Sequence, residues 1–230
     1  MATDEAPAEV PTATVTRREL AVARGLDQAR SRAENRVQLF LDAALELMNG
    51  GTGEFTVQEV AERSGQSLRT FYQYFAGKHE LLLTLFEDSI RASALHLGEV
   101  TAEGGHPLER LHRFAVEYFR MCRPHPDQAA RRPAPAMVDF AQRLLTSHPK
   151  EAARAFAPLV VLLEELLGDA AAAGEIRPGL DHRRIAGVVL QATMFNAFSA
   201  AISGSSLPPG DDTEPEILWD LLLRGIGTTA

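Results

Sequence analysis

The sequence predicts an all-α protein, with a small N-terminal three-helix head that carries a helix-turn-helix and a larger helical body behind it. Three observations support this fold class. Apolar residues recur at helical spacing along most of the 230-residue chain. No stretch shows the apolar–polar alternation typical of a half-buried strand. Clusters of Gly and Pro separate the helical stretches from one another.

The first predicted helix follows a flexible tail, to which we assign residues 1–29. Residues 1–16 are rich in Ala, Pro, Thr and acidic residues, which is typical of a disordered segment. The basic segment that follows these residues has two interpretations. It is either an arm that enters a DNA minor groove or a disordered stretch ahead of the first helix. That segment holds Arg17, Arg18, Arg24, Arg30 and Arg32. Apolar residues at helical spacing then predict a helix, which Asn49-Gly50-Gly51 ends: Val37, Phe40, Leu41, Ala44, Leu47 and Met48.

Two short helices behind this one predict the helix-turn-helix, within a head that spans residues 30–77. Thr56 is placed to cap a helix over 57–64, and Glu59 stands at the spacing of a capping box. Gly65 can adopt the positive φ of a sharp turn before a third helix over 68–75. Ala61 is small enough for two helices to cross closely, with Val60, Phe71 and Phe75 around it.

Residues 78–230 are predicted to form the body. Apolar spacing and breaks at Gly or Pro predict helices over 78–98, 107–123, 136–147, 150–173, 181–203 and 214–226. Residues 124–135 contain four prolines and predict an irregular connection. Leu207-Pro208-Pro209-Gly210 separates the last two helices.

Charge and cysteine content narrow the possible partners and compartments. The net charge of −8 weighs against a nucleic-acid partner, but residues 17–36 hold six Arg against Glu19, Asp27 and Glu34. This local excess of three positive charges suits phosphate contact, although a solvated helix face is the alternative. Cys122 is the sole cysteine, which excludes an internal disulfide and fits a reducing cytoplasm. The first residues lack the features of a secretory signal, so we expect a cytoplasmic protein.

The third helix carries side chains suited to reading DNA. The second helix of a helix-turn-helix lies in the major groove, with its first residues at base edges. Ser67, Arg69, Thr70 and Gln73 can form hydrogen bonds there, and Arg69 could clamp a guanine. Tyr72, Tyr74 and Lys78 can bond phosphate oxygens. The alternative is a helical hairpin with an aromatic core that binds no DNA.

The stretch from Phe55 to Leu82 resembles the DNA-binding head of the TetR family of bacterial regulators. The resemblance covers about residues 36–85 and lies in Gly65-x-Ser67-x-x-Thr70-Phe71-Tyr72-x-Tyr74-Phe75 followed by Lys78-x-x-Leu81. It implies phosphate contacts by Thr56 and Lys78, and contacts of Tyr72 and Tyr74 with the DNA backbone or thymine methyl groups. It also implies that Thr70 contacts a phosphate or base edge. Arg69 stands where the family often has a small residue, so it is a candidate for operator specificity.

The resemblance implies an effector chamber and a dimer interface in the body. The chamber residues that we predict, each of which could equally be ordinary core, are Phe114, Tyr118, Met121, Phe140, Leu144, Phe156, Val160, Leu163, Met194 and Phe198. Few charges accompany them, which favours an apolar or amphipathic effector. The predicted interface residues are Val188, Gln191, Ala192, Phe195, Ser199, Leu218, Trp219, Leu222 and Ile226. Polar residues interrupt the uncharged stretch 185–210, so a homodimer helix fits it better than a membrane span.

Together these features predict a homodimeric, ligand-responsive transcriptional regulator of double-stranded DNA. We expect a repressor that a small-molecule effector releases from a roughly palindromic operator. The alternative, a transcriptional activator, fits the sequence equally well. The sequence shows no catalytic set and no His-x-x-x-His pair, so we expect no enzyme activity, no metal and no cofactor. The alternative is a small all-α ligand carrier or enzyme without DNA binding, which a catalytic or metal constellation would favour.

Overall fold

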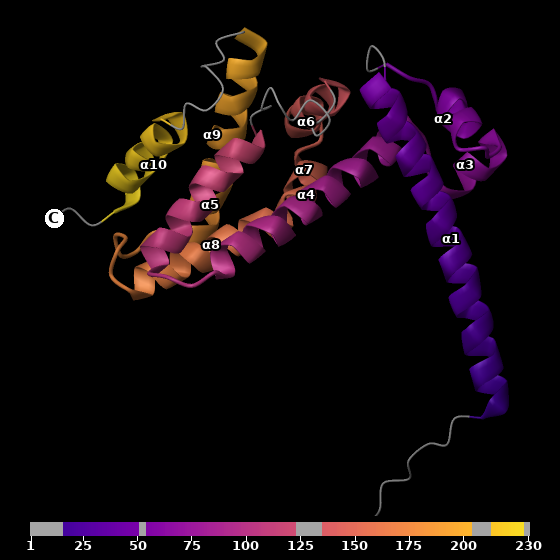
Figure 1. Ribbon diagram of the computed structural model, residues 1–230, viewed down its shortest axis with the longest axis horizontal. Helices are drawn as coiled ribbons and strands as arrows, with labels where there is room; N and C mark the ends of the chain where they lie inside the picture. The colour runs from indigo at the N-terminus through magenta and orange to yellow at the C-terminus, as the bar shows by residue number, and fades with distance from the viewer. Residues whose placement is uncertain (1–15, 51–53, 123–134, 204–212, 228–230) are drawn as a thin grey trace, which may run out of the picture.

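The computed structural model describes residues 16–50, 54–122, 135–203 and 213–227. These residues are almost entirely helical, which confirms the all-α prediction, and the β-contact within them is a single isolated bridge between Ile176 and Gly227. Figure 1 shows a head of three helices joined by a long helix to a larger body. The helices are α1 (Arg17–Gly50), α2 (Val57–Arg63), α3 (Leu68–Tyr74), α4 (Lys78–Ala102), α5 (Pro107–Cys122), α6 (Pro135–Ser147), α7 (Pro149–Ala155), α8 (Ala157–Ala172), α9 (His182–Ser203) and α10 (Thr213–Ile226).

The head is built around an aromatic core between α1, α2 and α3. Phe40 and Phe71 are fully buried, with ring centroids 5.3 Å apart in an edge-to-face arrangement. Val60 and Ala61 are also buried, as expected of residues that face the crossing of two helices. Gly65 has a φ of 66° in the turn, the left-handed conformation that a glycine adopts without steric cost. The local sequence thus produces the predicted helix-turn-helix.

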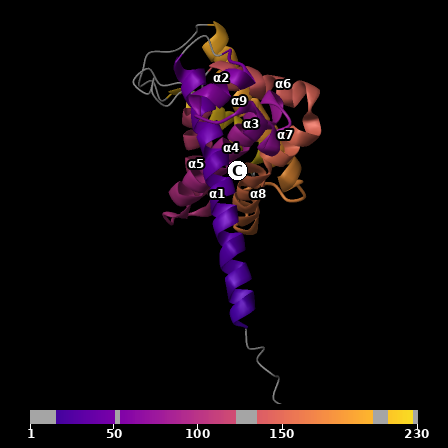
Figure 2. The ribbon, with the colours of Figure 1, turned by 90° about the vertical axis from the view of Figure 1, so that its right-hand side faces the viewer.

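The predicted flexible tail is wrong from residue 17 onward, because α1 begins there and is 20 residues longer than the apolar spacing indicates. The hydroxyl oxygen of Thr16 accepts a hydrogen bond from the Glu19 backbone N–H, and a Glu19 carboxylate oxygen accepts one from the Thr16 backbone N–H. This reciprocal capping box starts the helix. Arg30 and Glu34 pair one turn apart at 2.8 Å, and the segment contains no proline. Figure 2 shows this end of α1 running past the rest of the molecule, exposed throughout.

The body packs α5, α8 and α9 against one another, with α4 along one side and α10 against α5. The shorter α6 and α7 lie beside α4 near the head. One hydrophobic core continues from Phe40 and Phe71 in the head through Leu81 and Leu85 of α4 into the body. Because α4 contributes to both regions, its displacement would move the head relative to the body.

The single helix expected over 150–173 is wrong, because it is divided at Phe156 into α7 and α8. Phe156 caps the end of α7 and precedes the first residue of α8. Pro158 occupies the first turn of α8, where its missing N–H would have had no helical partner. Inside a continuous helix, the same proline ring would clash with the carbonyl of residue 154.

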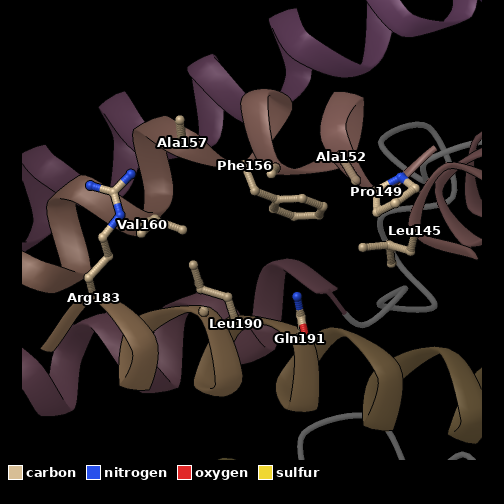
Figure 3. A pocket seen from close by; sticks show the side chains of 11 residues that line it. Leu145, Pro149, Ala152, Phe156, Ala157, Val160, Arg183, Leu190 and Gln191 are labelled. Carbon is tan, nitrogen blue, oxygen red and sulfur yellow. The ribbon is translucent and has the colours of Figure 1, made fainter. Parts of the chain in front are cut away.

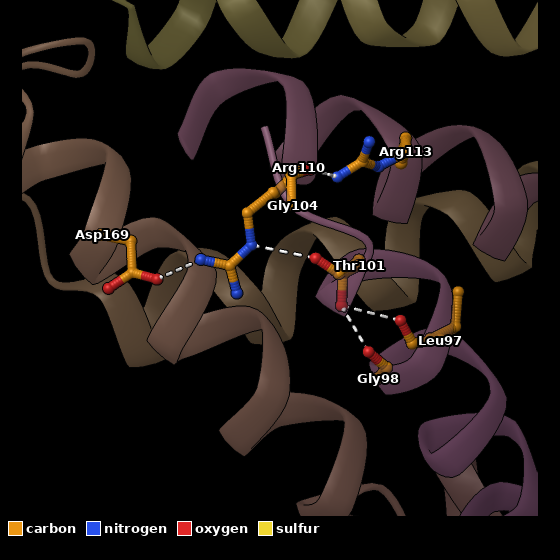
Figure 4. A network of polar contacts seen from close by, with 7 residues as sticks. All are labelled: Leu97, Gly98, Thr101, Gly104, Arg110, Arg113 and Asp169. Atoms are coloured by element: carbon orange, nitrogen blue, oxygen red, sulfur yellow. Dashed lines mark hydrogen bonds and ion pairs between the residues drawn. The ribbon is translucent and has the colours of Figure 1, made fainter. Parts of the chain in front are cut away.

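A polar network fastens the far end of α4 to α5 and α8 (Figure 4). Arg110 Nε donates to the Thr101 carbonyl oxygen at 2.9 Å, and its Nη1 lies 2.7 Å from Asp169 Oδ2. The buried Thr101 hydroxyl donates to the Leu97 carbonyl oxygen at 2.8 Å, so it is hydrogen-bonded as a buried polar group must be. Three helices therefore meet at one bonded corner, far from the head.

Among the helices of the described ranges, none combines the length and the apolar character that crossing a membrane requires.

Candidate nucleic-acid interface and internal pocket

The first turn of α3 presents the predicted reading surface. Ser67 caps this helix, and its Oγ accepts a hydrogen bond from the Thr70 backbone N–H at 3.0 Å. The Ser67 and Thr70 hydroxyl oxygens are also 2.8 Å apart and share a hydrogen bond. Both hydroxyls are therefore partly engaged within the helix. Their position at its N-terminus still leaves the neighbouring side chains free to reach outward.

Arg69, Tyr72 and Gln73 form an exposed polar face on α3, which we call the reading face. The Tyr72 residue is 59% exposed, although its ring lies edge-on to buried Phe71 with centroids 5.5 Å apart. A rigid anchor of this kind limits the entropy that an exposed side chain loses on binding. The reading face thus combines donors and acceptors with a fixed backbone.

The sequence predicts two roles for Thr56, a helix cap at the start of α2 and a phosphate contact. Its Oγ1 accepts from the Glu59 backbone N–H at 3.2 Å, while Glu59 Oε2 accepts from the Thr56 backbone N–H at 2.7 Å. This confirms the predicted capping box. These hydrogen bonds hold the pKa of the Glu59 carboxyl below its usual value. The resulting negative charge beside Thr56 would oppose a phosphate, so the contact stays a prediction.

Tyr74 and Lys78 are less available for phosphate than the sequence suggests. Tyr74 is half-buried and its ring packs against Phe40, with centroids 6.5 Å apart. Lys78 Nζ donates to the Phe55 carbonyl oxygen at 2.5 Å and lies 4.0 Å from the Phe55 ring centroid. Desolvation by burial lowers the pKa of Lys78. In this structure Lys78 clamps the start of α4 to the segment before α2.

A partly open pocket of about 270 Å³ lies where α7 and α8 face α9 (Figure 3). Phe156 and Val160 point toward Leu190, with Arg183 at one end and Leu145 and Pro149 at the other. The Arg183 Nη1 atom lies 3.7 Å from Glu164 Oε2. The lining residues are Leu145, Pro149, Ala152, Ala153, Phe156, Ala157, Val160, Arg183, Gly187, Leu190 and Gln191.

The structure distributes the predicted chamber residues over three environments. Phe156 and Val160 line the pocket, whereas Phe140 and Leu144 line a separate hollow of about 380 Å³ beside Lys78 and His79. The others that the structure describes pack within or against the core: Phe114, Tyr118, Met121, Leu163 and Met194. Phe198 belongs to α9, but its side chain lies outside the described residues. Arg183 is not among the predicted pocket residues, although its spacing of four and seven residues from Gly187 and Leu190 places all three on one helix face.

The predicted dimer residues also separate into two groups. Val188 and Phe195 of α9 are 60% and 72% exposed, and Ala192 is exposed beside them. Gln191 is exposed too, and it lines the pocket. The side chain of Ser199 lies outside the described residues.

On α10 the predicted interface residue Trp219 is buried within its own chain. Its side chain is 92% buried against the chain's own α5, where its ring lies 5.0 Å from that of His112. Leu222 and Ile226 pack on the same core, and Leu218 is half-buried. Ile217 and Leu221, which are not among the predicted interface residues, are 66% and 68% exposed. Helical spacing identified the apolar residues of α10 but not the face that meets α5.

The single cysteine offers no activated nucleophile. Burial raises the pKa of the Cys122 thiol to about 12, so the thiolate is scarce at neutral pH. The described histidines that pair with acids do so at exposed or half-exposed positions, as in His96 with Glu117 at 3.0 Å. The His96–Glu117 pair is an imidazole–carboxylate contact between α4 and α5.

Residues 40–85 match the model of the bacterial regulatory proteins of the tetR family. Among solved structures, the chain is similar to the transcriptional regulator FadR from Bacillus subtilis in complex with stearoyl-CoA. The TM-score is 0.63 and the sequence identity is 20%, and the match covers 82% of this chain and 98% of that one. The fatty acid degradation regulator FadR from Bacillus halodurans gives a TM-score of 0.62 and 19% identity over 83% and 95%. RolR in complex with resorcinol gives a TM-score of 0.62 and 18% identity over 87% and 92%.

No curated protein matches this sequence. The family model covers most of the head, and the solved structures share the fold over more than four-fifths of this chain. Residues 40–85 therefore match the DNA-binding head of the tetR family of bacterial regulatory proteins, and the described chain as a whole shares the fold of these solved regulators.

Proposed function

We propose that this protein is a dimeric, ligand-responsive repressor that binds a roughly palindromic DNA operator. The observation that carries the proposal is the reading face, formed by Arg69, Tyr72 and Gln73 on a helix that buried Phe71 anchors in the head. A helix of this kind enters the major groove with its first turn at base edges. Arg69 stands there and can donate two hydrogen bonds to one guanine.

The basic N-terminal part of α1 supports contact with DNA phosphates rather than insertion into the minor groove. A helix is about 10–12 Å across with its side chains, whereas the minor groove is only about 6 Å wide. Residues 17–36 are helical, so they do not fit the minor groove as an extended arm would. Arg17, Arg18 and Arg24 are exposed and can instead bind phosphates along the outside of the duplex.

The pocket supports a small effector with an apolar body and an acidic head group. Its volume of about 270 Å³ lies near the lower end of ligand pockets, and its walls are mostly aliphatic and aromatic. Arg183 supplies one guanidinium at the end, which a carboxylate could bind in place of Glu164. Gln191 adds an amide that can fix the orientation. Medium-chain carboxylic acids fit this description.

The exposed apolar residues on α9 and α10 support a second copy of the chain as partner. Val188, Phe195, Ile217 and Leu221 are each at least 60% exposed. A dimer that covers them would carry two heads, and these must stand about 34–36 Å apart, or a multiple of that, to reach successive major grooves. The basic N-terminal part of α1 would act with the head on DNA, while the body from residue 78 would hold the effector and the partner.

The position of α4 provides a route by which an effector could release the protein from DNA. The pocket lies against α7, and α7 packs on α4, whose first residue Lys78 is bonded to Phe55 beside the helix-turn-helix. An effector that favours a different position of α7 would therefore shift α4 and change the separation of the two heads. Such a molecule acts only through its different affinity for the two arrangements.

The test is a titration of the purified chain with DNA from directly upstream of its own gene, set against unrelated DNA and repeated over a salt series. We expect preference for the upstream DNA and affinity that falls steeply with salt. Arg69→Ala should reduce the preference between sequences by about 1–3 kcal/mol, while Arg91→Ala on the body serves as the matched control. Equal loss on every sequence would assign Arg69 to phosphate contact instead.

The alternative carrier without DNA binding has its own outcome. If neither the upstream DNA nor any fragment from a genome-wide selection binds, the regulator proposal fails and the carrier is favoured. If DNA binds, decanoate and its uncharged amide can be compared as releasing agents. Release by the acid alone, lost in Arg183→Gln, would support the acidic head group, and equal release by the amide would contradict it.

A further inference from the structure

A cluster of metal-ligating side chains lies outside both the reading face and the pocket. His79 belongs to the first turn of α4, while His148 and Glu151 stand at the start of α7. One ligand atom from each of the three lies within 4.8 Å of the others. The first histidine is separated from the other two residues by about seventy positions in the sequence, so the fold alone brings them together.

The spacing of the three groups is close to that of a metal site. His79 Nε2 lies 2.7 Å from Glu151 Oε2, and His148 Nδ1 lies 3.9 Å from the same oxygen. A tetrahedral ion with bonds of about 2.0–2.1 Å holds its ligand atoms roughly 3.3 Å apart. Small side-chain rotations would therefore bring all three atoms to one ion. The imidazole rings already stand side by side, with centroids 4.6 Å apart.

The donor set selects the kind of ion. Two imidazole nitrogens with one carboxylate suit zinc, cobalt, nickel or copper, whereas magnesium and calcium prefer sites made of oxygen atoms. Three protein ligands leave a fourth position for water, and the partial exposure of all three side chains gives water access. The Phe140 ring packs against the His79 ring, with centroids 5.5 Å apart, and helps to hold this ligand in place.

The surrounding charges oppose a purely electrostatic cation site. Lys78 and Arg143 line the same hollow as His79 and His148, and Arg154 lies near Glu151. A hard cation held mainly by charge would be repelled here. Binding must therefore come from coordination bonds to the imidazoles, which strengthens the selection of transition metals.

We propose that His79, His148 and Glu151 together bind one divalent transition-metal ion that joins the first turn of α4 to the start of α7. The neighbour of His79 is Lys78, whose ammonium group holds the Phe55 carbonyl beside the helix-turn-helix. The ion would thus fasten the head end of α4 to the effector-binding body. The proposal concerns binding alone and does not depend on the regulatory function.

Other His–Glu contacts in the described chain provide a matched control. His96 pairs with Glu117 at 3.0 Å and His112 with Glu216 at 2.9 Å. Each brings one imidazole to one carboxylate at a helix contact, as in the cluster. Neither belongs to a set of three ligand groups in the described chain. Substitution of His96 therefore removes a similar ion pair without removing a ligand of the proposed site.

The experiment is a Co²⁺ titration of the tag-free full chain, followed by visible absorption and checked by Zn²⁺ displacement. We expect one ion per chain, a ligand-field spectrum that Zn²⁺ abolishes, and no competition from millimolar Mg²⁺. His79→Gln and Glu151→Gln should each weaken binding at least as much as loss of an outer-shell partner, which is about 10- to 100-fold. His96→Gln should bind as the wild type does. A melting curve shows whether each variant is folded.

Two outcomes would overturn the proposal: no saturable Co²⁺ spectrum from the wild-type chain, or unchanged binding by the folded His79→Gln variant. Either would leave the three groups as an ion-pair cluster. The readout contains no DNA, so a failure here says nothing against operator binding. Conversely, a chain that binds Co²⁺ but no operator would contradict the proposed function alone.

Discussion

The head and the body use the same secondary structure but are specified in different ways. In the head, two seven-residue helices are held by caps from Thr56 and Ser67 and by a turn at Gly65. In the body, long helices pack through extended apolar faces, and some of those faces, such as Phe195 on α9, remain exposed. The aromatic core of the head is complete within one chain, whereas the body leaves an apolar face of α9 exposed, which the proposed dimer would cover. The difference predicts that substitutions in the head act on stability and DNA reading, and those on α9 act on assembly.

The largest effect is expected from Phe71→Ala. The side chain is fully buried and contacts both Phe40 and Phe75, so its removal leaves a cavity at the centre of the head. Truncation of a buried Phe costs about 3–5 kcal/mol. Urea unfolding should show this loss, and operator binding should fall with it. If stability changed by less than about 1 kcal/mol, the aromatic core would not be what holds the head together.

Phe195→Glu should separate assembly from folding. This residue is 72% exposed in the single chain, so the substitution should leave the unfolding of the monomer nearly unchanged. A charge placed in the centre of a dimer contact should weaken association by about 2 kcal/mol or more. Sedimentation over a concentration series measures the shift. Leu95→Glu on α4, a residue that is 67% exposed, serves as the control, and equal effects of both substitutions would place the interface elsewhere.

Thr56→Ala removes the side-chain half of the capping box at α2. Loss of an N-cap hydroxyl costs about 1 kcal/mol, within a range of roughly 0.5–2. The effect should appear as a lower midpoint of thermal unfolding and a modest loss of operator affinity. Thr56→Ser keeps the hydroxyl and should restore most of the stability. A Ser variant as unstable as the Ala variant would assign the effect to the methyl group.

The smallest effect concerns pH and also belongs to the head. The folded-state pKa of Glu59 is lowered by hydrogen bonds from Thr56. Its contribution to stability is therefore present above the unfolded value of 4.5 and is lost as pH falls through that value toward the lower folded one. Glu59→Gln should lose this pH-dependent part, so the variant's melting temperature should fall less than that of the wild type between pH 7 and pH 3.5. Parallel curves would contradict the assignment.

The sequence by itself determined the head because its signals are local. A cap and its partner stand three residues apart, the turn glycine follows the helix that it ends, and aromatic residues repeat at helical spacing. The same kind of signal, Thr16 with Glu19, marks the true start of α1, and Pro158 marks the break before α8. Both features can be recognised in the sequence, but the spacing of apolar residues alone does not reveal them.

Only the tertiary structure decided which apolar residues line the pocket, which face of α10 is buried and which ionisable groups meet. Helical periodicity identifies an apolar face but not the element that covers it, so Trp219 and the exposed Leu221 could not be distinguished. Likewise, His79 and Glu151 are hydrogen-bonded at 2.7 Å although they are 72 positions apart. Contacts of this kind depend on how whole helices pack, and that packing is set by the sum of many side-chain contacts rather than by any short stretch of sequence.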